Sequence, residues 1–217
     1  MAGLVVLSAP ASEPITTAEA KTYLRITGSS EDTFIDTLIK TARMFCEEYT
    51  NRALISQTLV LTVDAYNEMA DPLWEGVKTG PYLNYYKNYI DLPRPPVTSV
   101  TSVKTYDDDD TATTMSSTKY YVDTARESAR VVLRTGETFP TALRVANAIE
   151  VTYVAGYASA NAVPEPLKLG MYQIIAHLYE HRGDMYDSNM MTPMTKRLFA
   201  PYIVYGGSGS SKFMALG

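Results

Sequence analysis

The chain has 217 residues, 46% of them hydrophobic and 20% charged, which is ordinary for a soluble globular protein that buries a core of its own. Its 19 lysines and arginines are outnumbered by 24 aspartates and glutamates, and the net charge of −5 argues against tight binding of nucleic-acid phosphates. The only cysteine, Cys46, excludes an intrachain disulfide, and no stretch is long and apolar enough to span a bilayer.

An N-terminal arm is predicted over residues 1–14. Its apolar run, Leu4–Leu7, is too short for a signal peptide and lacks a basic start. A short helix is predicted over 15–26, because Thr16 and Glu19 fit the capping box in which each side chain satisfies an otherwise unpaired backbone amide.

A longer helix is predicted from Ser30 or Asp32 to about Tyr49. Its apolar residues recur at steps of three and four and form one stripe, which consists of Phe34, Ile35, Leu38, Ile39, Ala42, Phe45, Cys46 and Tyr49. This pattern predicts that Cys46 is a small core residue and not a reactive thiol.

From Leu54 the apolar period becomes that of extended structure, and residues 55–157 predict an antiparallel β insert between two helical segments. Strands are predicted over 56–64, 88–93, 97–106, 120–123, 130–134 and 148–157. Three prolines, Pro93, Pro95 and Pro96, predict a corner or a sheet edge, since proline donates no backbone hydrogen bond.

Two connections inside the insert are candidate functional segments. The first is a long loop over 66–87 that is rich in aromatic residues: Trp74, Tyr82, Tyr85 and Tyr86. Long ordered loops usually have a function, and tyrosine, of which the chain has 17, is enriched where proteins meet proteins.

The second segment is a run of four aspartates: Asp107, Asp108, Asp109 and Asp110. A calcium loop would require alternating ligands, a glycine and a terminal glutamate, and the run has none of these. The run predicts a solvated hairpin turn, although many copies around a pore would form a negative ring.

A third helix is predicted from Leu167 to about Arg182, with the stripe Leu167, Met171, Ile174, Ile175, Leu178 and Tyr179. A further short helix is predicted over 196–205. The chain then continues with a Gly- and Ser-rich stretch, Gly206–Ser211, whose composition predicts a flexible spacer, and with the apolar residues Phe213–Leu216.

One catalytic alternative is a zinc-dependent hydrolase that uses His177, Glu180 and His181, which match the H-x-x-E-H spacing of some zinc peptidases. Such a site needs a third protein ligand from elsewhere in the chain. The only acids after His181 are Asp184 and Asp187, too close in sequence to come from a separate helix. We therefore expect that the protein is not an enzyme and holds no metal or cofactor.

A second alternative is a β-rich module that binds carbohydrate or peptide through the aromatic loop.

Several phrases occur in an order that resembles the head–tail connector proteins of tailed bacteriophages, also called adaptor or head-completion proteins. They cover residues 15–26, 31–39, 48–58, 92–97, 151–157, 163–168 and 176–180. The resemblance extends over about 15–183, whereas the length of the aromatic loop and the chain after Gly183 depart from the pattern.

The resemblance implies a ring, typically of twelve copies, that sits under the portal protein of a virion assembled in the bacterial cytoplasm. The ring would extend the DNA channel, let duplex DNA pass without specific binding, and offer a platform to the tail or to a second adaptor.

The predicted fold class is α+β, with helices from both chain ends packed together around an antiparallel β-sheet or small sandwich. A connector domain would span 15–187, with a helical frame of 15–52 and 164–183, and 188–217 would form a C-terminal extension. A hypothetical contact surface for the portal or an adjacent subunit consists of Phe199, Tyr202, Ile203, Tyr205 and Phe213.

Overall fold

The structure is a computed structural model that describes residues 2–65, 89–140, 142–182 and 191–204. Its helices are α1 (Thr17–Leu24), α2 (Asp32–Thr50), α3 (Glu165–Glu180) and α4 (Pro193–Phe199), with 3₁₀ turns η3 (Ala160–Ala162) and η4 (Ala200–Tyr202). Its strands are β1 (Ala2–Ser8), β2 (Gln57–Val63), β3 (Tyr89–Asp91), β4 (Val97–Tyr106), β5 (Ala112–Thr114), β6 (Tyr120–Asp123), β7 (Arg130–Leu133) and β8 (Ile149–Ala155). The predicted α+β class is confirmed.

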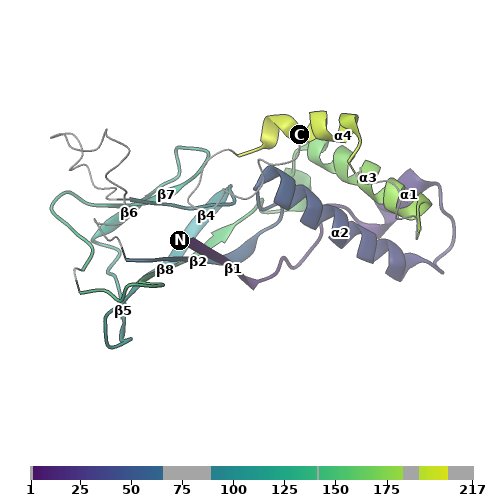
Figure 1. The fold of residues 1–217 in the computed structure, drawn as a ribbon. Coiled ribbons are helices and arrows are strands. Elements are labelled where there is room, and N and C mark those ends of the chain that lie inside the picture. The colour runs from purple at the N-terminus through teal and green to yellow at the C-terminus, as the bar shows by residue number, and fades with distance from the viewer. Residues whose placement is uncertain (1, 66–88, 141, 183–190, 205–217) are drawn as a thin grey trace, which may run out of the picture.

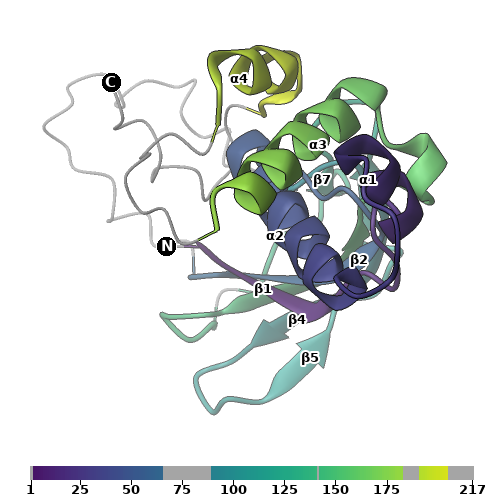
Figure 2. The same ribbon diagram turned by 90° about the vertical axis from the view of Figure 1, so that its right-hand side faces the viewer.

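The helices gather at one end of the molecule and the strands at the other (Figures 1 and 2). Helices α1 and α2, from the N-terminal part, pack against α3 and α4, from the C-terminal part. Their shared core includes Ile35, Ile39, Cys46, Leu167, Met171, Ile174 and Phe199. The predicted capping box begins α1, where the Thr16 and Glu19 side chains each accept from the other's backbone amide.

The strands form two antiparallel sheets with the orders β1-β2-β8-β4-β5 and β3-β7-β6. Alternate residues of β2 and β8 are buried, as a sheet covered on one face requires. A second core joins the two sheets and includes Leu59, Leu61, Val103, Tyr120, Val131, Leu133, Val151 and Tyr153. The insert is therefore a pair of sheets that share one core.

The helical part and the sheets are joined through the buried carboxylate of Glu47. Its Oε1 accepts hydrogen bonds from the backbone amide of Leu54 (2.9 Å) and from the side-chain amide of Gln57 (3.0 Å), at the start of β2. Its other oxygen pairs with Arg43 (2.8 Å), which also binds Glu13 (2.7 Å) on the segment before α1. The paired side chains of Glu47 and Arg43 thus fix α2, the start of β2 and the N-terminal segment to one another.

Two strands depart from the sequence prediction. The predicted N-terminal arm contains β1, which pairs antiparallel with β2, and the stretch after the aspartates contains β5, which pairs with β4. All three residues of β5 are exposed, so no hydrophobic alternation marks it. The short helix predicted over 196–205 is found at Pro193–Phe199, followed by the turn η4. No helix in the described ranges is long and apolar enough to cross a membrane.

Candidate assembly surfaces

The first candidate surface is strand β1, at the outer edge of the five-stranded sheet. Its four central side chains remain exposed to solvent, with exposed fractions of 36% for Leu4, 61% for Val5, 49% for Val6 and 66% for Leu7. The register pairs Val6 with Leu59 and Val5 with Val60, so successive β1 side chains point to opposite faces of the sheet. An apolar edge of this kind is a template for another strand. Sequence reasoning tested this run only against a signal peptide, and its β-branched residues were the signal that could have identified a strand.

The second candidate surface is the C-terminal segment, in which the predicted contact residues have different positions. Phe199 is fully buried, with its ring 5.9 Å from that of Tyr49. Gly170 of α3 makes room for it, because a Cβ at that position would lie 2.2 Å from Phe199 Cε1. Phe199 therefore serves the core of its own chain and is not an exposed contact residue.

Tyr202 and Ile203 are half-buried and lie where the chain leaves the helices. The guanidinium Nε of Arg52 donates to the carbonyl oxygen of Tyr202 (2.5 Å), and the amide of Val204 donates to the carbonyl oxygen of Thr50 (3.0 Å). These bonds hold the last described residues against the end of α2. Of the other predicted contact residues, Tyr205 and Phe213 lie outside the described residues.

The four aspartates lie at the tip of the β4–β5 hairpin, as predicted. Asp107 closes the turn, because its Oδ1 accepts from the amides of Asp109 (3.1 Å) and Thr111 (2.8 Å). Asp110 has a left-handed backbone (φ 62°) and pairs with Arg144 (2.9 Å). Asp108 and Asp109 keep exposed side chains, so the turn presents negative charge to solvent.

A cluster that sequence reasoning missed ties the start of α2 to the end of α3. Glu31 accepts a hydrogen bond from the hydroxyl of Tyr179 and pairs with Arg182 (2.9 Å). The Arg182 guanidinium also lies over the rings of Phe34 (4.5 Å) and Tyr179 (4.4 Å). The hydrogen bond from Tyr179, and then the one from Arg182, lower the pKa of Glu31. Glu31 in turn raises the pKa of Tyr179.

The candidate zinc residues lie at the C-terminal end of α3. The rings of His177 and His181 stack with centroids 4.4 Å apart, and His181 Nδ1 lies 2.9 Å from the carbonyl oxygen of His177. Glu180 is exposed. Among the residues that the structure describes, no three histidine, cysteine or acidic side chains come together as metal ligands. Asp184 and Asp187 lie outside those residues.

The remaining features considered as functional sites are the single cysteine and a hollow on the surface. Cys46 is fully buried, so it is a core residue as predicted, and burial raises the pKa of its thiol.

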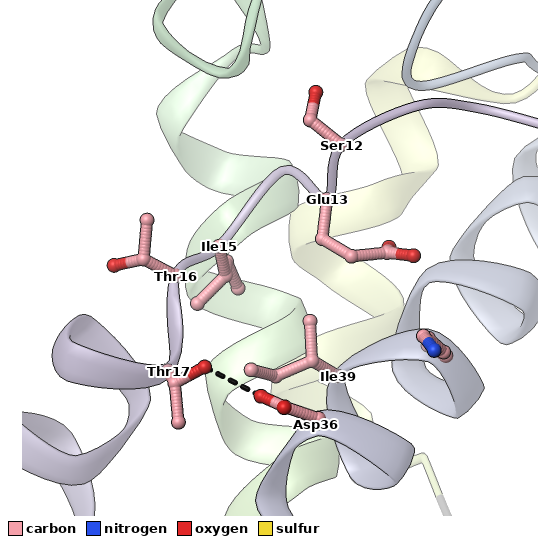
Figure 3. A pocket seen from close by; sticks show the side chains of 8 residues that line it. Ser12, Glu13, Ile15, Thr16, Thr17, Asp36 and Ile39 are labelled. Carbon is pink, nitrogen blue, oxygen red and sulfur yellow. Dashed lines mark hydrogen bonds between the residues drawn. The ribbon is translucent and has the colours of Figure 1, made fainter. Parts of the chain in front are cut away.

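A hollow of about 380 Å³ lies between the segment before α1 and helix α2 (Figure 3). Thr17 donates a hydrogen bond to Asp36 (2.5 Å) at its margin. The aromatic loop residues Trp74, Tyr82, Tyr85 and Tyr86 lie outside the described residues.

Comparison with known structures shows which proteins share this fold. A chain from the virion of a native gene transfer agent particle is 22% identical, with a TM-score of 0.71 and coverage of 95% of this chain and 97% of that one. A chain from the neck of an empty particle of this kind, computed with C6 symmetry, is 21% identical, with a TM-score of 0.71 and coverage of 95% and 98%. A chain from the neck of a native particle, computed with C12 symmetry, is 20% identical, with a TM-score of 0.69 and coverage of 95% and 98%.

These identities are low, so the three structures establish the fold alone. No curated protein matches the sequence. The model of one family, "Head completion protein", matches residues 13–190, which is most of the chain and includes the helices α1, α2 and α3 and both sheets apart from β1. The chain belongs to the head completion protein family.

Proposed function

We propose that this protein is a head–tail connector, a structural protein of the neck of a phage-like particle. The observation that carries the proposal is the family match over residues 13–190. The fold shared with chains from particle necks supports it. Membership of this family indicates a structural role and not an enzymatic one.

In this proposal many copies form a ring that docks under the portal protein and presents a platform to the tail or to a second adaptor. The C12 symmetry of one neck with this fold supports a ring of twelve. Ring closure requires a head-to-tail contact between neighbouring copies, in which two different surfaces of each copy meet. The net charge of −5 suits a channel through which DNA slides, because few phosphates would be neutralised.

Two segments are proposed to make the contacts with other proteins. The C-terminal segment is proposed to contact the portal or an adjacent subunit through Tyr202, Ile203, Tyr205 and Phe213, since its aromatic residues are of the kind enriched at protein interfaces. The aromatic loop, residues 66–87, is proposed to meet a neighbouring subunit or the tail side, since tyrosine and tryptophan dominate protein interfaces.

The test is inactivation of the gene in the host that produces the particles. We expect DNA-filled heads without tails in electron micrographs, and recovery of tailed particles when the intact gene is supplied. Tailed, infectious particles formed without the protein would refute the connector role.

The same complementation assay tests the two segments. A chain that carries serine at Trp74, Tyr82, Tyr85 and Tyr86 is expected to leave heads tailless, and a chain with phenylalanine at the three tyrosines is the matched control. A chain that ends at Val204 tests the C-terminal contact. It retains the core residue Phe199, which deletion of 188–217 would remove. Normal numbers of tailed particles from both altered chains would refute these contacts.

A further inference from the structure

We infer that neighbouring copies in the ring pack sheet against sheet, with the outer face of the three-stranded sheet of one copy against the outer face of the five-stranded sheet of the next. The inference rests on the proposed ring and identifies the surfaces through which its copies meet. Because the two sheets share one core, their outer faces point to opposite sides of the insert. A head-to-tail contact needs two different surfaces of this kind.

The outer face of the three-stranded sheet carries an aromatic row. The register places Val132 of β7 between Tyr89 of β3 and Tyr121 of β6. The next residue of β7, Leu133, is buried in the core, so Val132 and its two neighbours point outward. Tyr121 is 46% exposed. Tyrosine is enriched where proteins meet, so a row of this kind across three strands favours contact with another protein surface.

Arginines lie over both rings of this row. The guanidinium of Arg130 is 5.1 Å from the centroid of the Tyr89 ring. Arg134 follows β7 directly, and its guanidinium is 5.9 Å from the centroid of the Tyr121 ring. In the part of the chain that the structure describes, Arg130 pairs with Asp123 (2.9 Å), whereas no carboxylate pairs with Arg134. The exposed charge of Arg134 can therefore meet an acid of another copy.

The outer face of the five-stranded sheet offers a surface that fits this row. Alternate residues of β2 and β8 are buried in the core, and the residues between them point outward: Thr58, Val60, Thr62, Glu150, Thr152 and Val154. Val60 lies beside Thr152 in the middle of this set, and Val5 of β1 extends their row with an exposed fraction of 61%. Glu150 is the one charged member of the set, so the rings of a neighbour can pack on the middle row without burying a charge.

The five-stranded sheet has a defined direction relative to the helices, which gather at one end of the molecule (Figure 1). At the start of β2, Gln57 donates a hydrogen bond to Glu47 of α2, so this end of the outer face lies next to the helices. Glu150 is paired with Thr62, near the other end of β2. The acidic residue of the face therefore lies at the end away from the helices.

The three-stranded sheet has the same direction. The connection between β6 and β7 lies at the helical end, because its Glu127 pairs with Arg52, shortly after α2. Strand β7 runs away from this connection, from Arg130 to Leu133. Arg134 therefore lies at the far end of its face, as Glu150 does on the other face.

Neighbours in the ring bring these matching rows together. In a ring of the proposed C12 symmetry, each copy is rotated by one twelfth of a turn relative to the next, so the helical ends of neighbours lie side by side. The aromatic row of one copy then packs on Val60 and Thr152 of the next, and Arg134 lies against Glu150. The carboxylate of Glu150 is half-buried and lies 3.5 Å from Lys104, and its remaining lone pairs can accept from a second cation.

A charge exchange tests the contact in the particle assay. Arg134→Glu and Glu150→Arg each bring like charges together, so each variant should give several-fold fewer tailed particles than the unaltered gene. The double variant Arg134→Glu/Glu150→Arg restores opposite charges between copies and should recover most of the yield. The matched control is Arg126→Glu/Glu150→Arg, which should not recover, because Arg126 is exposed in the β6–β7 connection at the helical end. Normal yields from both single variants, or equal yields from the two double variants, would overturn the inference.

The connector role and this contact fail in different ways. Tailed particles formed after inactivation of the gene would refute the connector role. Loss of tails without the gene, together with normal yields from both single variants, would refute the contact alone.

Engineered cysteines give a second test that keeps every charge. Cys46 is buried and will not react. Val132→Cys and Thr152→Cys are placed in one chain, and purified particles are treated with a short bismaleimide crosslinker. Each copy would be linked to two neighbours, so the protein should run as a ladder of multimers, whereas each single variant should stay monomeric. A dimer from a single variant, or no linkage in the double variant, would overturn the inference.

Discussion

At the scale of single residues, the carboxylate of Glu47 links helix α2 to the segment that enters β2. Its side chain is almost completely buried, and both oxygens are engaged. A buried carboxylate is tolerated only where its charge and its hydrogen bonds are satisfied. Arg43 supplies the charge, while Leu54 and Gln57 supply amide donors from the segment that enters β2. The carboxylate therefore holds the helices and the sheets together.

Replacement of Glu47 by alanine should reduce the free energy of unfolding by about 3–5 kcal/mol, because the substitution removes one of the two carboxylates that pair with Arg43 and leaves two buried amide donors without an acceptor. The measurement is urea denaturation followed by circular dichroism. The adjacent Glu48 is exposed, so Glu48→Ala serves as the matched control, with an expected change within about 0.5 kcal/mol. Equal effects of the two substitutions would contradict this role of Glu47.

At the scale of elements, the contact between α2 and α3 ends in a polar cluster at the tip of the helical part. Glu31, Tyr179 and Arg182 lie on the surface, so their interactions are screened by solvent. Their arrangement nevertheless lowers the pKa of Glu31 below its ordinary value of 4.5. Such a group stabilises the folded state above its ordinary pKa, and that stabilisation is lost as the pH falls through the pKa of the folded state.

The variant Tyr179→Phe removes the hydrogen bond that contributes most to this shift. We expect a lower thermal midpoint than that of the unaltered protein at pH 7, and a difference that shrinks toward zero at an acidic pH below the pKa of Glu31 in the folded state. Comparison of the two proteins is necessary, because Glu19 and Asp123 also have lowered pKa values and destabilise both proteins in acid.

Tyr23→Phe is the control for this experiment. Tyr23 also loses a hydroxyl, but its contact with Tyr172 is a ring stack with centroids 5.1 Å apart. The thermal midpoint of the variant Tyr23→Phe should therefore differ from that of the unaltered protein by the same amount at both pH values. A pH-independent difference for Tyr179→Phe would show that the ring packing of Tyr179 and not its hydrogen bond to Glu31 is responsible.

The elements with a strong apolar period could be predicted from the sequence, and the others could not. Helix α2 carries a continuous stripe and β8 alternates throughout, so both were predicted nearly to their observed bounds. Strand β1 is apolar at every central position although neither of its faces is fully covered, so no alternation of apolar and polar residues reveals it. The burial of Phe199 depends on Gly170 from another helix, and the Glu31 cluster joins residues 148 positions apart. Local patterns contain no information about such contacts.

At the scale of the whole molecule, the two ends differ in what they present. The helical end is closed by packed side chains and the Glu31 cluster, whereas the sheets carry an apolar edge at β1 and an acidic tip at the β4–β5 hairpin. In a ring of identical copies, each of these features is repeated around the axis. We expect the acidic tips to face the DNA channel, where negative charge keeps the passing duplex from adhering.

This expectation can be tested with Asp108→Lys/Asp109→Lys, which raises the charge of each chain by four units and spares the structural roles of Asp107 and Asp110. Lysines in the channel would contact phosphates, so particles with this variant should release DNA more slowly, and added salt should restore the rate. The control, Glu48→Lys/Glu180→Lys, makes the same charge change at exposed positions on α2 and α3. Slower release from both variants would mean that total charge governs passage, and unchanged release from the hairpin variant would place the acidic tips away from the channel.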